Sequence, residues 1–340
     1  MKMIKTSLKI LLLLVVLVGV IGVFLPDSVH VERSVVIDAP QATVFVLING
    51  FKNFNRWSPW YARDPNAEFS YEGPEQGVGA RMTWASVETN LGSGSQEIVD
   101  SEPSELVRTH LDFGQRGTAE ATFELRAVDG GTEVTWGFDT EFGWDLMGRY
   151  YGLFIDRLVG TDYEQGLEGL KEFAESLPAA DWSDLNLQIV TVDPVVMAYS
   201  DGVSSWDEAE MAQALGAAYS RVRAFMSAHE LQQSGPPVAV TRLATEDTWH
   251  FEAGIPLQEG LESQPAGETE VFIRDTYGGR VIRAIHVGSH EGLRQTLEKV
   301  DAYIAAYDLS KTGNLWHEWV SDRGSTSVDR LITNVCVPIR

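Results

Sequence analysis

The sequence contains a single cysteine, Cys336, so no disulfide can form within the chain. Its apolar neighbours Val335 and Val337 predict a small buried side chain rather than a nucleophile. Basic residues are also scarce, since 26 lysines and arginines stand against 49 acidic residues and give a formal net charge of −23. This surplus of negative charge repels nucleic acids, so we expect no nucleic-acid partner.

The usual sequence signatures of catalysis and cofactor binding are also missing. There is no G-x-S-x-G nucleophile motif, no phosphate-binding loop and no pair of catalytic carboxylates. His286 and His290 are four residues apart, but Gly288 lies between them and no third metal ligand is suitably spaced. We therefore expect no metal site and no cofactor.

The N-terminus contains an uninterrupted apolar run, Ile10 to Leu25, preceded by Lys2, Lys5 and Lys9. At about 1.5 Å per residue, this run and its flanks are long enough to cross a hydrocarbon core of roughly 30 Å. A cleaved signal peptide is the alternative, but it would have a shorter core and a small-x-small site. The sequence therefore predicts a single transmembrane helix within residues 1–28, anchored in the cytoplasmic membrane. The lysines would lie inside, and the rest of the chain on the outer (periplasmic or extracellular) face.

The next 150 residues have the pattern of an antiparallel meander closed by a long helix. Alternating strand candidates are separated by glycine-rich or acidic turns. Apolar residues then recur at helical spacing from Trp144 to Leu177, and Gly160 interrupts them at a point where a kink is one interpretation. The predicted strands are 29–37, 67–71, 80–85, 95–101, 105–113, 119–127 and 132–138.

Residues 29–178 resemble the START-like, or polyketide cyclase/dehydrase-like, superfamily. The resemblance is carried by V-x-I-D-A-P-x-x-x-V-F from Val35 to Phe45, by Trp57-Ser58-Pro59-Trp60 and by the closing helix. It implies a helix-grip fold, in which a curved sheet wraps the helix around an apolar cavity. Members bind lipids, hormones or polyketides, and only some are enzymes. Trp57, Trp60 and Trp84 are candidates to line the cavity, with ordinary core packing as the alternative.

The last part of the chain, residues 185–340, contains an approximate internal repeat. Ala198-x-x-x-Gly202 and Ala284-x-x-x-Gly288 each end a predicted strand and precede a helical pattern. Leu231 and Gly235 then have the same spacing as Leu309 and Gly313, before closing strands that contain I-P-L and V-P-I. We interpret this as two copies of a strand–helix–strand–strand unit, because pairing them buries the sheet edge and helix face that each would expose. The first copy is expected to begin with one strand, residues 187–199.

Glu318 lies between two tryptophans in the predicted strand Leu315–Val320. Alternation places Trp316 and Glu318 on one face, and His317 and Trp319 on the other. A lone carboxylate among indoles suits a flat, hydrophobic, cationic molecule, because the aromatic faces attract the cation and the carboxylate neutralises it. A solvated acid at a sheet edge is the alternative. The other candidate ligand-binding residues are Trp249, Phe251, Trp319, Tyr199, Tyr277 and His286.

The duplication, with a glutamate in the penultimate strand and a terminal V-P-I strand, resembles the gyrase-inhibitor-like domain. The same module is the effector-binding domain of AraC-type and multidrug-binding regulators. The resemblance implies a cleft on a pseudo-twofold axis, with Glu318 at its base and aromatic walls. No helix-turn-helix precedes the module in this chain, so the transcription-factor role of many relatives is not expected.

The sequence thus predicts an α+β chain with a membrane anchor, a helix-grip domain and a duplicated effector-binding domain. The leading hypothesis is a membrane-anchored, non-catalytic protein that senses or sequesters hydrophobic small molecules or lipids, cationic ones among them. One alternative is a hydrolase of strained electrophilic toxins, in which Glu318 acts as the base. The other is a non-catalytic interaction scaffold whose pockets are filled by side chains.

Overall fold

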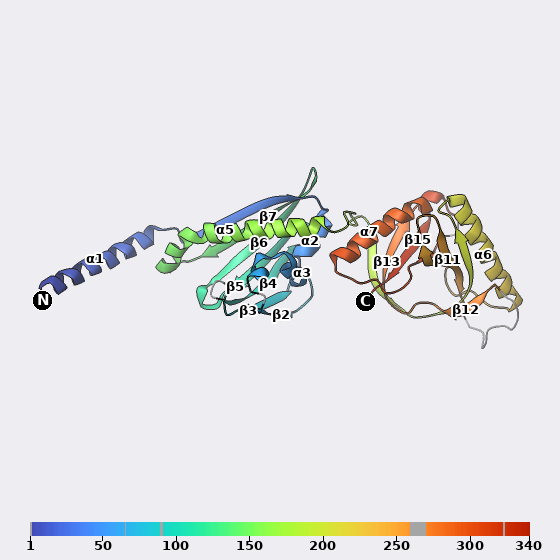
Figure 1. Ribbon diagram of the computed structural model, residues 1–340, viewed down its shortest axis with the longest axis horizontal. Coiled ribbons are helices and arrows are strands. Elements are labelled where there is room, and N and C mark those ends of the chain that lie inside the picture. The colour runs from blue at the N-terminus through green and yellow to red at the C-terminus, as the bar shows by residue number, and fades with distance from the viewer. Residues whose placement is uncertain (1, 65, 89–90, 259–269, 322–323) are drawn as a thin grey trace. The chain divides into compact units, whose positions relative to one another are not determined.

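The computed structural model describes residues 2–64, 66–88, 91–258, 270–321 and 324–340. The chain divides into two compact units, residues 1–181 and residues 182–340. Each unit combines helices with one antiparallel sheet (Figure 1). The predicted α+β class is therefore confirmed, with two separate antiparallel sheets.

The first unit contains a seven-stranded sheet in the order β1-β7-β6-β5-β4-β3-β2. Three short helices follow the first strand, and the long helix α5 packs along the sheet (Figure 1). The strands lie within a few residues of those predicted from alternation. Their bounds are β1 Ser28–Ile37, β2 Glu68–Glu72, β3 Arg81–Ala85, β4 Ser93–Glu102, β5 Leu106–Asp112, β6 Thr118–Val128 and β7 Gly131–Glu141; the helices are α2 Gln41–Ile48, α3 Phe51–Trp57, α4 Pro59–Arg63 and α5 Leu146–Glu175.

Helix α5 continues through Gly160 without a break. Gly160 is needed for a different reason than a kink, because a Cβ there would overlap the guanidinium of Arg33 from strand β1. Arg33 donates from Nε to Glu164 at 2.7 Å and from Nη2 to Asp156 at 3.1 Å, one turn to either side of the glycine. The glycine therefore fixes helix α5 against strand β1.

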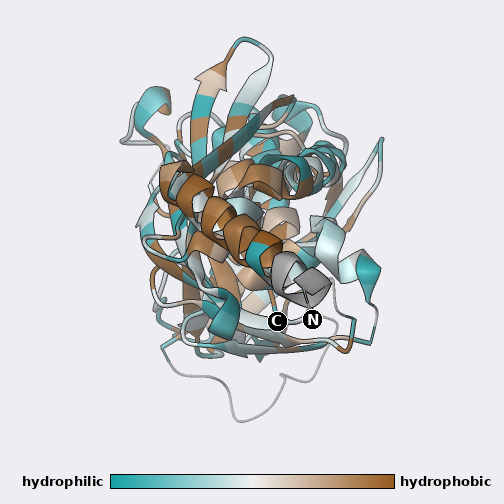
Figure 2. Cartoon of the chain, turned by 90° about the vertical axis from the view of Figure 1, so that its left-hand side faces the viewer, coloured by the Kyte–Doolittle hydropathy of each residue, from teal (hydrophilic) through white to brown (hydrophobic). Residues whose placement is uncertain are grey.

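Helix α1, Lys2–Phe24, leads into strand β1. Its described apolar side chains are exposed, with Phe24 at 84%, and the helix is hydrophobic along most of its length (Figure 2). It contacts the first half of α5, where the Tyr150 hydroxyl donates to the carbonyl of Val18 at 2.7 Å. Arg149 donates to the carbonyls of Val23 and Leu25 at 2.9 and 3.0 Å, so α5 caps the last turn of α1.

The predicted membrane anchor is contradicted. In the part of the chain that the structure describes, no helix combines the length and the apolar character needed to cross a membrane. The single-pass location in the cytoplasmic membrane and the membrane partner were therefore wrong predictions.

The second unit contains an eight-stranded antiparallel sheet in the order β12-β9-β11-β10-β14-β15-β13-β8. One half of the unit runs β8-β9-α6-β10-β11 and the other runs β12-β13-α7-β14-β15. The bounds of the first half are β8 Asn186–Val192, β9 Val196–Ser204, α6 Glu208–Ala228, β10 Val238–Ala244 and β11 Trp249–Pro256; those of the second half are β12 Phe272–Asp275, β13 Gly279–Val287, α7 Leu293–Ala306, β14 Trp316–Trp319 and β15 Ile332–Pro338.

The first strand of each half pairs with the other half. Strand β8 pairs with β13, and β12 pairs with β9. The single strand predicted over residues 187–199 is in fact two strands, β8 and β9, and Pro194 lies in the break between them. Proline has no backbone N–H to donate to a sheet, which explains why the strand ends there. The repeated unit therefore has five elements rather than four, and the exchanged strands join the two halves.

The two faces of this sheet differ. Helix α6 packs on one face with Val222 against Ala198 and Phe251, and α7 packs on the same face with Val300 against Ile282 and Val335. The opposite face has its own small apolar cluster, formed by Met197, Val238, Val240, Val281, Trp316 and Cys336. We call it the open face, because neither α6 nor α7 packs on it.

Candidate functional site

Strand β14 lies in the middle of the sheet, between β10 and β15. Its register places Glu318 beside Val238 of β10 and Asn334 of β15, and Trp316 beside Val240 and Cys336. Paired residues in an antiparallel sheet point to the same side. Trp316 and Glu318 therefore both belong to the open face, while His317 and Trp319 point toward the helices.

Two neutral donors hold the carboxylate of Glu318. Its Oε1 accepts a hydrogen bond from the Trp316 indole at 3.1 Å, and its Oε2 accepts one from the Asn334 amide at 2.8 Å. The nearest described cation is Nη2 of Arg283, which is 3.8 Å from Oε1. This distance is too long for a hydrogen bond. The side chain of Glu318 is 16% exposed, so the group is partly desolvated and only loosely neutralised.

Apolar and aromatic side chains surround Glu318 on the open face. Val238 and Cys336 are buried beside it, and the Tyr277 ring lies 6.0 Å from that of Trp316. Tyr199 packs against the same cluster. Burial, followed by the neighbouring Glu318 carboxylate, raises the pKa of the Cys336 thiol to about 12. The thiol is therefore protonated near neutral pH and is a poor nucleophile.

The structure separates the other sequence-predicted residues from Glu318. Trp249 and Phe251 belong to the core beneath α6. Trp319 donates from its indole to the Tyr219 hydroxyl of α6 at 2.8 Å. The ring of His286 lies between the Thr296 hydroxyl and the Ser289 carbonyl, 2.8 Å from each. These four residues face the helices, whereas Trp316, Tyr199 and Tyr277 share the face of Glu318.

Two neighbours of Glu318 were not found by sequence reasoning. Arg283 and Asn334 come from strands β13 and β15, and only the folded sheet brings them to the carboxylate. Arg283 had a detectable signal, because it interrupts the otherwise apolar stretch from Val281 to Ile285. A charged residue inside an apolar strand is rarely buried without a partner.

The open face carries a second carboxylate, Glu252, whose side chain is 6% exposed. Glu252 pairs with Val240 in the register, so it points to the same side as Glu318. Unlike Glu318, it accepts a hydrogen bond from Arg274, and Nε of Arg242 lies 3.4 Å away. The Arg274 guanidinium also lies over the ring of Tyr199, 5.3 Å from its centre. Glu252 is therefore fully paired.

The interior of the first unit is filled by aromatic rings. Trp136 stacks on Tyr163 at 3.8 Å, and Trp57 and Trp60 each meet Trp136 edge-on at 5.7 Å. Trp57 is 5% exposed and belongs to the core. Trp84 lies farther along the sheet, 6.0 Å from Phe113. Trp57 and Trp60 thus take part in the packing of the core.

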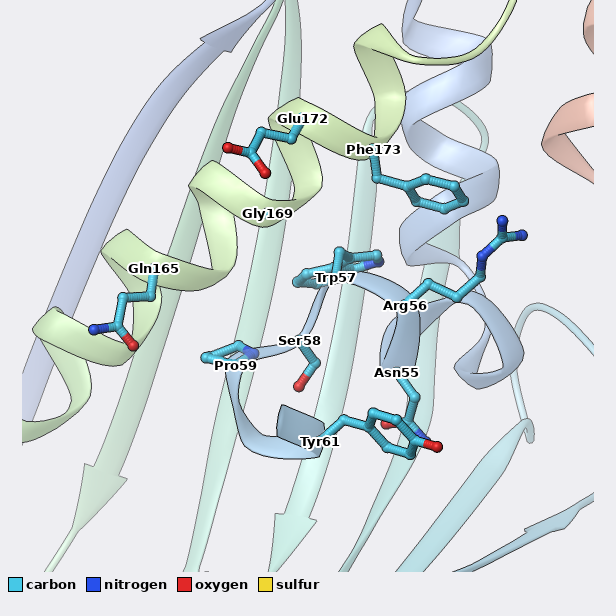
Figure 3. Close-up of a pocket in the computed structure, with 10 residues that line it drawn as sticks. All are labelled: Asn55, Arg56, Trp57, Ser58, Pro59, Tyr61, Gln165, Gly169, Glu172 and Phe173. Carbon is cyan, nitrogen blue, oxygen red and sulfur yellow. The ribbon is translucent and has the colours of Figure 1, made fainter. Parts of the chain in front are cut away.

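An open groove of about 600 Å³ lies outside this aromatic core (Figure 3). It runs between the α3–α4 turn and the C-terminal half of α5. The Arg56 guanidinium lies over the Phe173 ring, 4.3 Å from its centre, at one end of the groove. The lining residues are Asn55, Arg56, Trp57, Ser58, Pro59, Tyr61, Gln165, Gly169, Glu172 and Phe173. Among the residues described here, no three His, Cys, Asp or Glu side chains are placed to hold a metal ion.

Residues 28–175 match the protein family described as polyketide cyclase / dehydrase and lipid transport. The first domain is therefore similar to members of this family. The match agrees with the seven-stranded sheet packed on α5 and leaves the second domain unassigned. No protein of curated function matches the chain.

Several solved structures are similar to part of the chain. The C-terminal domain of EcmrR is 9% identical, covers 46% of this chain and 98% of its own, and gives a TM-score of 0.41. A protein from Chromobacterium violaceum is 15% identical over 44% of this chain and 99% of its own, with a TM-score of 0.33. An uncharacterized conserved protein from Listeria innocua is 14% identical over 46% and 92%, with a TM-score of 0.35. At these values the similarities carry no inference about ligand or activity.

Proposed function

We propose that the protein binds small hydrophobic molecules, cationic ones among them, and that the second domain holds them at Glu318. The first domain supports the general class, because the family that it matches is described by polyketide and lipid chemistry. The second domain supports the site, because its open face combines a carboxylate with aromatic and aliphatic side chains. No enzymatic step is needed to account for this arrangement.

The incomplete neutralisation of Glu318 carries the proposal. Its two hydrogen bonds come from neutral groups, and the guanidinium of Arg283 stays 3.8 Å away. A partly buried carboxylate gains most from a cation that makes direct contact with it. An aromatic cation would add contacts with Trp316 and Tyr277, at roughly 0.5–2 kcal/mol for each cation–π pair.

The test is to titrate the protein and its Glu318→Gln variant with benzyldimethylpropylammonium, a hydrophobic aromatic cation, by isothermal titration calorimetry. Removing one partner of a desolvated charge pair costs roughly 3–5 kcal/mol, so we expect the affinity to fall about 100-fold or more. Glu246→Gln is the matched control, because Glu246 is an exposed carboxylate of the same domain. Equal affinity in the wild type and Glu318→Gln would show that Glu318 does not bind the cation.

The packed interior of the first domain favours a second candidate function, an interaction scaffold. Its aromatic rings are in mutual contact where a ligand cavity was predicted. Native mass spectrometry of the purified protein distinguishes the two functions. A bound small molecule of defined mass supports the binding protein, and a bare chain that recruits only protein partners supports the scaffold.

A further inference from the structure

We infer that the ligand at Glu318 is a zwitterion, whose anionic group is bound by Arg283 while its cation is bound by Glu318. This inference rests on the proposed function and adds the chemical class of the ligand. It is based on the different hydrogen bonding of the two charged groups. The carboxylate already has two close hydrogen-bond donors, whereas the arginine has almost no acceptors.

Arg283 has unused hydrogen-bonding capacity. Its Nε is buried and has no hydrogen-bond partner in the described part of the chain. Its other neighbours at the site are the thiol of Cys336, a weak acceptor, and Glu318 at 3.8 Å. A guanidinium presents five donors in a planar fork that matches a carboxylate or phosphate. The unpaired Nε therefore indicates that a ligand supplies the missing hydrogen-bond acceptor.

Arg283 is also accessible. Its side chain is 30% exposed and that of Glu318 is 16% exposed, so solvent reaches part of each side chain, although the Nε atom of Arg283 itself is covered. Beneath them lie Cys336 and Val281, both fully buried. The two charges thus stand side by side above an apolar floor on the open face. This arrangement can receive a polar group of a ligand without unfolding the sheet.

The same geometry disfavours a ligand that is only a cation. Such a ligand would contact Glu318 within a few ångströms of the Arg283 guanidinium, and like charges at that distance repel each other. A zwitterion removes the conflict, because its anion pairs with Arg283 while its cation pairs with Glu318. Selection therefore depends on both groups, and Arg283 is the specificity-determining residue.

The experiment compares two matched probes by calorimetry, benzyldimethylpropylammonium and its analogue with a terminal carboxylate on the propyl arm. We expect the wild type to bind the zwitterion roughly 10-fold more tightly than the cation, the usual effect of one charge-assisted hydrogen bond. In Arg283→Gln the preference should disappear, because the zwitterion is weakened roughly 10-fold while the cation keeps its affinity. Arg280→Gln, an exposed arginine on the same strand, should change neither affinity.

Each result bears on the inference in a defined way. If the wild type binds the cation but gains nothing from the carboxylate, the zwitterion inference is wrong and the proposed function stands. If neither probe binds, both are wrong. Should Arg283→Gln fail to fold by circular dichroism, Arg283→Lys replaces it. Lysine keeps the charge but loses the fork, so it should retain part of the preference for the zwitterion, and a complete retention would contradict a bidentate contact.

Discussion

The two halves of the second domain place different residues at equivalent positions of their central strands. Strands β10 and β14 pair with Val238 opposite Glu318, Ala239 opposite His317, and Val240 opposite Trp316. A twofold axis through the Ala239–His317 pair makes these two residues equivalent. It also relates Val238 to Trp316 and Val240 to Glu318. One half therefore uses three small apolar residues where the other uses an indole, an imidazole and a carboxylate.

This difference shows that the fold does not require the polar residues of β14. At these three positions each strand is paired with its neighbours in the sheet, and β10 has only valine and alanine there. A buried or partly buried polar group costs desolvation free energy unless it is well paired. Residues that break the apolar pattern without serving the fold are expected at functional sites. The comparison therefore singles out Trp316, His317 and Glu318 independently of their contacts.

A second difference concerns Glu252 and Asn334, which occupy equivalent positions in β11 and β15. Glu252 pairs with Val240 as Asn334 pairs with Glu318. Glu252 is buried between two arginines, whereas Asn334 is neutral and serves as a donor to Glu318. We therefore interpret Glu252 as a structural carboxylate and Glu318 as a binding carboxylate.

The largest expected effect is that of Glu252→Gln on stability. The substitution leaves the guanidinium groups of Arg274 and Arg242 without their shared counter-ion. Breaking a buried charge pair from one side costs roughly 3–5 kcal/mol. Urea denaturation followed by circular dichroism should show a loss of this size. A loss below about 1 kcal/mol would contradict a structural role and would remove the contrast with Glu318.

A second prediction uses His317, which stands where the first half has Ala239. Its ring is buried, and neither of its nitrogens has a hydrogen-bond partner in the described part of the chain. Burial, followed by the nearby His286, lowers the pKa of His317 from 6.5 to about 4. Because the pKa is lower in the folded protein, the unfolded chain binds this proton at a higher pH than the folded protein does. The neutral, buried ring of His317 therefore makes its full contribution to folding stability above pH 6.5, and this contribution is lost as the pH falls toward 4.

The size of this loss follows from the two pKa values. The difference between 6.5 and about 4, at roughly 1.4 kcal/mol per pH unit, corresponds to about 3 kcal/mol. Unfolding free energies measured by urea at pH 7 and pH 4 should fall by about this amount more in the wild type than in His317→Leu. The leucine variant is its own control for the other titrating groups. An identical acid dependence in both proteins would mean that His317 is not buried in its neutral form.

These residues also show how far sequence reasoning reached. Alternation separated Trp316 and Glu318 from His317 and Trp319, because the faces of one strand depend only on local geometry. It could not relate β11 to β14, because that relation passes through the register of β10. Trp249 and Phe251 were therefore predicted to lie beside Glu318. In the structure it is the adjacent residue, Glu252, that points to the same face as Glu318. Arg283 was missed for the same reason, since it reaches Glu318 only through β15.

The first domain was more predictable because its sheet is a meander. Neighbouring strands from β2 to β7 follow one another in sequence, so each pattern of alternation reports on an adjacent hairpin. What the pattern could not provide was the volume of the interior. Trp57 and Trp60 are compatible both with a cavity wall and with a filled core. Only the positions of Trp136 and Tyr163 show that the rings pack against one another.

The smallest expected effect is that of Glu318→Gln on stability. Its size determines whether weaker binding by this variant can be attributed to a lost ligand contact. Glutamine keeps one acceptor oxygen for Trp316 or Asn334, so about one hydrogen bond is lost. A single hydrogen bond contributes roughly 1 kcal/mol. Arg283 loses only a loose ion pair and, at 30% exposure, can turn to solvent. Urea denaturation should therefore show a change of no more than about 1 kcal/mol, several-fold smaller than for Glu252→Gln. If the two variants instead lose equal stability, Glu318 supports the fold, and weaker binding by its variant would no longer identify a ligand contact.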